Sequence, residues 1–146
     1  MPKPYGENLR FLKDTMSTIN EILKAAEDNP KSIMNHMGNK YLRSFMEAAY
    51  LTEKKLTLPE GDPPFKTNLQ HEFQVPSGVF WQFAKKIDLF QRPDIGPKLE
   101  QQFILQLESM SEVEAKIVLA AKDQKLNKMF KGLTLKVLKE VGYFPA

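Results

Sequence analysis

Apolar residues recur at intervals of three and four along most of the chain, the spacing that places them on one face of an α-helix. The longest such run covers residues 8–28. It ends before Pro30 because the residue preceding a proline is pushed out of the helical conformation. The run also fits a heptad seam, so it predicts either packing within the chain or a homodimer. The seam positions would be Leu9, Leu12, Met16, Ile19 and Leu23.

The same spacing predicts further short helices at 30–37, at 39–51, at 77–90, from 97 onward, from 111 onward, around 126–130 and at 135–141. The whole bundle is expected to have six to eight short helices. Asn39, Ser77, Ser111 and Thr134 are typical N-cap residues, and Glu114 completes a capping-box pattern with Ser111. No segment alternates apolar and polar residues for more than a few positions. The sequence therefore predicts an all-α fold, a compact helical bundle.

The centre of the chain, at about 52–78, departs from this pattern. Four prolines and two glycines interrupt it, so neither a regular helix nor an inner strand is expected there. Apolar side chains spread through the segment favour an ordered loop pinned across the surface, and they are Leu56, Leu58, Phe65, Leu69 and Phe73. We expect one domain over residues 1–146. Its last residues, 143–146, either dock on the bundle or form a free recognition peptide.

Composition supports a single globular domain, because 42% of the 146 residues are hydrophobic and 27% are charged. The chain has no cysteine, which excludes disulfides and thiolate chemistry and fits a cytoplasmic protein. The longest purely apolar run, 117–121, is far too short to cross a membrane, so no membrane association is expected.

Positive charge is concentrated near the C-terminus, although the net charge of the whole chain is only +3. The strongest cluster consists of Lys122, Lys125, Lys128 and Lys131, spaced about one helical turn apart. These lysines predict either a solvated face or a surface that binds nucleic acid or another acidic partner. Arginines and aromatic rings, which read and stack bases, do not alternate with them.

Candidate catalytic chemistry is sparse. The two histidines, His36 and His71, lack metal-ligand spacing, and no phosphate-binding or nucleophile motif is present. The carboxylate pairs Glu60/Asp62 and Glu112/Glu114 are better explained by turn chemistry and by the first turn of a helix. The sequence therefore predicts a protein that is not an enzyme, with no cofactor and no metal.

Aromatic residues beside the proline-rich loop predict a partner-binding surface. Trp81, the only tryptophan, lies at the edge of an apolar helix face, and Trp and Phe are common anchors of protein interfaces. Core packing is the default reading for these rings. The residues expected to contact a partner are Pro63, Pro64, Phe65, Phe80 and Trp81.

The segment Leu58-Pro59-Glu60-Gly61-Asp62-Pro63-Pro64-Phe65-Lys66 resembles an LPEG-x-PP-aromatic-K element in a family of small tailed-phage proteins of unknown function, found mostly in T4-like phages and cyanophages. Residues 103–111 and 121–134 are similar to the closing block of that family. The resemblance implies a phage protein in the cytoplasm of an infected bacterium, and it brings no activity, cofactor or site residue.

Together these features predict a non-enzymatic accessory protein that binds a host or phage protein. A nucleic-acid-associated factor is the alternative, and an uncharacterised enzyme is the third reading.

Overall fold

A computed structural model describes residues 18–59, 61, 63, 78–93 and 96–145 of the protein, and within these ranges the chain is helical with no strand. The all-α prediction is confirmed. The α-helices are α2 (Ile19–Asp28), α3 (Lys40–Tyr50), α4 (Gly78–Lys85), α5 (Pro97–Ser109), α6 (Glu112–Lys122), α7 (Leu126–Met129) and α8 (Leu135–Glu140). Three short 3-10 helices accompany them in the described ranges, η1 (Pro30–His36), η2 (Thr52–Lys54) and η4 (Ile87–Gln91).

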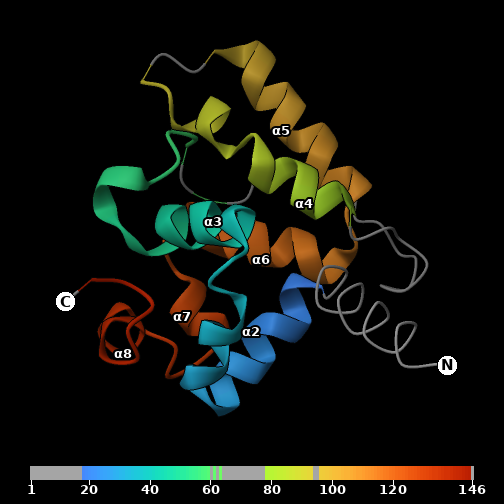
Figure 1. Ribbon diagram of the computed structural model, residues 1–146. Helices are drawn as coiled ribbons and strands as arrows, with labels where there is room; N and C mark the ends of the chain where they lie inside the picture. The colour runs from blue at the N-terminus through green and yellow to red at the C-terminus, as the bar shows by residue number, and fades with distance from the viewer. Residues whose placement is uncertain (1–17, 60, 62, 64–77, 94–95, 146) are drawn as a thin grey trace, which may run out of the picture.

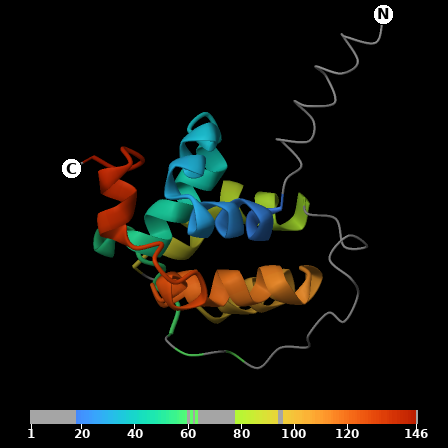
Figure 2. The same cartoon turned by 90° about the horizontal axis from the view of Figure 1, so that it is seen from below.

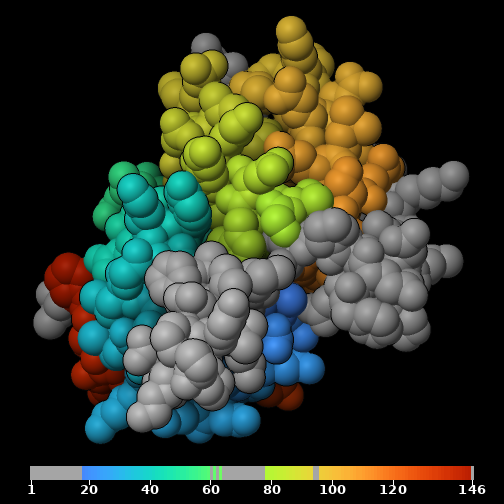
Figure 3. All heavy atoms as spheres, turned by 45° about the vertical axis from the view of Figure 1, so that its right-hand side comes forward, coloured from blue at the N-terminus to red at the C-terminus, as the bar shows by residue number. Residues whose placement is uncertain are grey.

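Helix α3 lies at the centre of the bundle, where it packs against α4 on one side and α6 on another (Figure 1). Helix α2 contacts η1 and α6, and α5 contacts α4 and α6. Seen after a quarter turn, α6 runs beneath the layer that contains α2, α3 and α4 (Figure 2). The space-filling view shows α3 and α4 lying directly against each other on one face (Figure 3).

Side-chain caps begin several helices where the sequence predicts them. The Asn39 side chain accepts hydrogen bonds from the first turn of α3, Ser111 accepts from the Glu114 amide, and Thr134 accepts from the Val137 amide. Pro97 occupies the first turn of α5, where its missing N–H is not needed. The polar residues before each apolar run therefore set these helix starts.

The first long run is interrupted, contrary to the expectation of one helix over 8–28. Thr18 has an extended backbone with ψ 155°, and it caps α2 by a reciprocal capping box with Glu21. Residues 8–17, with Leu9, Leu12 and Met16, lie outside the described residues. Ile19 and Leu23 are 0% exposed in the core of this chain. They cannot also form a homodimer seam, so that prediction is wrong for these two positions.

The segment predicted as one helix at 77–90 is also divided. Helix α4 ends at Lys85, and η4 begins at Ile87. The change of direction brings Phe83 and Phe90 into a stacked contact with 5.6 Å between ring centroids. Phe103 of α5 packs against both rings at 5.9 and 5.6 Å. Aromatic packing thus accompanies the break in regular helix.

The first part of the proline-rich loop is pinned to the bundle, as its apolar residues predict. Leu56 and Leu58 are buried, and between them the Thr57 amide donates to the Phe90 carbonyl at 2.9 Å. The Thr57 hydroxyl also donates to the Arg92 carbonyl at 2.6 Å. The anchors Phe65, Leu69 and Phe73 lie outside the described residues.

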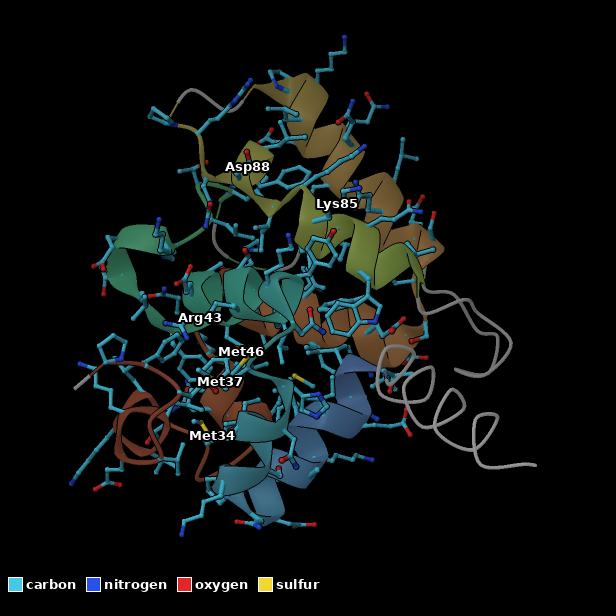
Figure 4. All side chains as sticks on the ribbon, viewed as in Figure 1. Met34, Met37, Arg43, Met46, Lys85 and Asp88 are labelled. Carbon is cyan, nitrogen blue, oxygen red and sulfur yellow. The ribbon has the colours of Figure 1, made fainter. Side chains whose placement is uncertain are left out.

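The C-terminal segment docks on the bundle, which confirms one of the two readings of its sequence. Tyr143 and Phe144 are buried, and the Arg43 guanidinium lies over both rings, 5.2 and 5.1 Å from their centroids. Arg43 also donates to the Tyr143 carbonyl at 2.7 Å. Figure 4 shows Arg43 on α3 beside this segment, with Met34 near α8. A cation–π contact and a charged hydrogen bond therefore hold the tail.

Candidate functional site

Lys122 is the centre of the most unusual polar cluster among the described residues. Its ammonium donates to the carbonyls of Pro59 and Gly61 at 2.7 and 3.0 Å and to Asp123 Oδ1 at 2.7 Å. The Gly61 amide donates to Asp123 Oδ2 at 3.1 Å. We call this group, formed by Lys122, Pro59, Gly61 and Asp123, the Lys122 anchor. It fastens the proline-rich loop to the end of α6.

Burial makes the Lys122 anchor electrostatically demanding. The Lys122 side chain is 1% exposed and that of Asp123 is 10% exposed. A buried ammonium is tolerated when its protons are hydrogen-bonded, and here three oxygens accept them. Burial alone raises the pKa of the Asp123 carboxyl. The hydrogen bonds from Lys122 and from the Gly61 amide, with the charges of Lys122 and Lys125, outweigh burial and lower this pKa below its ordinary value.

The turn after α6 explains why Lys122 is separated from the lysines that follow. Gln124 has a left-handed backbone with φ 56°, and its side-chain amide donates to the carbonyls of Ala48 and Leu51 at 3.1 and 2.7 Å. Helix α6 therefore ends at Lys122 and α7 starts at Leu126. Because the helix is broken between them, the even spacing of the lysines in sequence does not put them on one face.

A depression of about 500 Å³ opens beside the Lys122 anchor. We call it the lysine hollow. Its described lining residues are Gly61, Lys116, Leu119, Ala120, Asp123, Lys125, Lys128 and Met129. It is an open depression of the surface, not an enclosed cavity.

The lysine hollow combines positive charge with apolar surface. Lys125 and Lys128 are exposed and form no ion pair with any residue that the structure describes, whereas Lys116 pairs with Glu112 at 3.0 Å. Met129 is 40% exposed, one of four large apolar side chains that are exposed among the described residues. The negative charge of Asp123 is already balanced by Lys122. The lining is therefore suited to a ligand that carries an anionic group next to an apolar group.

The structure corrects one of the four predicted nucleic-acid-binding lysines. Lys122 is buried and its ammonium is occupied, so its predicted place on a binding face is wrong. Lys125 and Lys128 lie together at the lysine hollow. Lys131 is exposed but is not among the residues that line it.

The structure also removes one residue from the predicted partner-binding surface of Pro63, Pro64, Phe65, Phe80 and Trp81. Phe80 is 0% exposed and packs edge to face on Phe45, with 4.9 Å between centroids. It offers no surface to a partner, which corrects the prediction for this residue. Trp81 and Pro63 are half-buried, and Trp81 packs against the core, so contact of these two residues with a partner remains a prediction. Pro64 and Phe65 lie outside the described residues.

The described part of the chain offers no clustered metal ligands. No group of three or more His, Asp or Glu side chains there could hold a metal ion. His36 lies in the last turn of η1, while His71, Glu60 and Asp62 are not described. None of the helices in those ranges is both long and apolar enough to cross a membrane.

The structure also identifies site residues that sequence reasoning passed over. Gly61 and Asp123 hold the loop against α6, and Met129 forms part of the surface beside them. Gly61 and Asp123 are 62 positions apart in sequence, so no local signal of their contact was present.

Comparisons of the chain with protein-family models, with curated proteins and with solved structures found no match.

Proposed function

We propose that the chain is a non-enzymatic accessory protein that binds another protein through the lysine hollow. The observation that carries this proposal is the exposed pair Lys125 and Lys128 beside the apolar surface of Met129. A surface of this kind attracts a partner of opposite charge and offers it apolar contact area. The loop that forms part of the wall is the same segment in which sequence analysis predicts partner binding.

The proposal places the protein in the cytoplasm of an infected bacterium, as a phage-encoded factor acting on a host or phage protein. The likeness of residues 58–66 to a tailed-phage family supports this origin. The absence of cysteine fits a reducing compartment.

Binding to nucleic acid is the second candidate, favoured by the exposure of Lys125, Lys128 and Lys131. Lysine contacts to phosphate would give an affinity that falls steeply with salt. No arginine and no aromatic ring is among the described residues that line the lysine hollow. Sequence-specific readout and base stacking would therefore need residues other than these.

Affinity capture during infection tests the proposal. Tagged protein is compared with a Lys125→Glu/Lys128→Glu variant and with a matched control, Lys24→Glu/Lys85→Glu, which changes two exposed lysines on α2 and α4. We expect a specific protein that is kept by the control and lost by the hollow variant, before and after nuclease treatment. A partner kept by all three proteins would refute the lysine hollow as the binding surface, and recovery that depends on nucleic acid would favour the second candidate.

Trp81 provides an independent comparison. A Trp81→Ala variant should retain the same partner if the lysine hollow is the binding surface. Loss of the partner from this variant alone would move the interface to Trp81.

A further inference from the structure

The lysine hollow has features that restrict the chemistry of its occupant beyond a general preference for protein. Its lining includes the apolar residues Leu119, Ala120 and Met129, of which Met129 is exposed. Methionine side chains are unbranched and polarizable, so they adapt to differently shaped apolar groups. An apolar group that contacts a methionine side chain removes apolar surface from water, and this burial is favourable. A purely ionic ligand has no apolar surface to bury.

The charges of the lining indicate an anionic occupant. Lys125 and Lys128 bring two exposed ammonium groups to the lysine hollow, and Lys116 brings a third that it shares with Glu112. The carboxylate of Asp123 would repel such an occupant, but it is held by the buried ammonium of Lys122 at 2.7 Å. The Lys122 anchor thus removes the one unfavourable charge of the described lining.

A polynucleotide would use this surface poorly. Phosphates could reach the lysines, but the bases would meet methionine and alanine in place of the aromatic or guanidinium planes on which they stack. An acidic protein segment uses both components, because carboxylates and an apolar side chain can alternate at the spacing of neighbouring residues.

Resting on the proposed function, we infer that the lysine hollow takes a short acidic protein segment with one apolar side chain between its carboxylates. The apolar side chain packs on Ala120 and Met129, and the flanking carboxylates pair with Lys125 and Lys128. Lys122 is a positioning residue here, because it keeps the loop and the Asp123 carboxylate in place without touching the ligand.

Fluorescence anisotropy on the full chain tests this inference with three labelled probes. The first is a short peptide of Glu and Asp with a single central Leu, the second replaces that Leu by Ser, and the third is a single-stranded oligothymidine of equal charge. At low ionic strength we expect the Leu peptide to bind about tenfold more tightly than the Ser peptide, from the burial of one side chain. The oligothymidine should bind no more tightly than the Ser peptide.

Three variants locate the binding. Lys125→Glu/Lys128→Glu should abolish binding of both peptides, while the matched Lys24→Glu/Lys85→Glu variant should keep it. Met129→Ser should remove the advantage of the Leu peptide and leave the Ser peptide unchanged. All of these substitutions are at exposed positions, and circular dichroism verifies that each variant is folded.

Equal affinity for the Leu and Ser peptides would overturn the inference and leave the proposed function intact, because charge alone would then explain capture of the partner. Absence of peptide binding at low ionic strength would also overturn it, while the capture experiment would still decide the proposed function separately. Tighter binding of the oligothymidine would overturn both in favour of nucleic acid.

Discussion

Replacing Lys122 by Met isolates the contribution of the Lys122 anchor to stability. Methionine keeps most of the volume of the buried side chain, so the substitution removes the charge and its hydrogen bonds without opening a large cavity. The carbonyls of Pro59 and Gly61 lose their shared donor, and the Asp123 carboxylate loses its ion pair. The perturbation therefore acts on the contact between loop and helix.

The size of the effect follows from what each group does once the ammonium is gone. A hydrogen bond to a charged group contributes about 1.5–3 kcal/mol. Pro59 and Gly61 are exposed, so their carbonyls regain water when the loop lifts, whereas Asp123 is left 10% exposed without its cation. The desolvation cost of burying Lys122 is relieved at the same time. We expect the free energy of unfolding to fall by about 2–3 kcal/mol.

Urea denaturation measures this change. With an m-value of about 1–3 kcal/mol/M, the midpoint should move down by about 1 M. Lys125→Met removes an exposed lysine of the lysine hollow and serves as the matched control, expected to change stability by less than about 0.5 kcal/mol. A loss for Lys122→Met that equals that of the control would refute the view that the buried ammonium holds the loop.

Three further predictions concern the C-terminal tail, the cap of α2 and the carboxylate of the Lys122 anchor. Arg43→Met should lower the free energy of unfolding by about 1–3 kcal/mol and speed amide hydrogen exchange at Tyr143 and Phe144, because the tail loses its cation–π contacts and its hydrogen bond. Unchanged exchange rates at these two amides would contradict this role of Arg43. Thr18→Ala should cost about 1 kcal/mol in thermal or urea unfolding through loss of the cap on α2, and an unchanged midpoint would show that the capping box is dispensable. The lowered pKa of Asp123 stabilises the fold above the ordinary carboxyl pKa, and this contribution is lost as pH falls below it. Asp123→Asn should therefore flatten the acid side of the stability profile, and parallel profiles would argue against the ion pair.

Local sequence signals predicted much of the fold. Asn39, Ser111 and Thr134 cap helices where their side chains indicate, since a cap needs only neighbours within a few residues. The start of α2 was accessible in the same way, because Thr18 and Glu21 have capping-box spacing. The continuous apolar periodicity across 8–28 concealed that boundary.

The burial of Lys122 and Phe80 depends on long-range contacts and could not be predicted from the sequence. Lys122 looked like a surface lysine because its spacing to Lys125 continues a helical pattern, and the left-handed turn at Gln124 that breaks the pattern depends on carbonyls of Ala48 and Leu51. Likewise, Phe80 is buried because Phe45 packs on it from α3, a helix that is distant in sequence. Burial of this kind is decided by tertiary neighbours, which periodicity alone does not specify.

An NMR titration with the acidic Leu peptide tests most directly whether an acidic protein segment binds at the lysine hollow. We expect amide shifts to cluster at Gly61, Lys116, Ala120, Lys125 and Met129, residues that share this surface. The Trp81 indole N–H signal should stay unchanged. Shifts centred on Trp81, or no shifts at any peptide concentration at low ionic strength, would contradict binding at the lysine hollow.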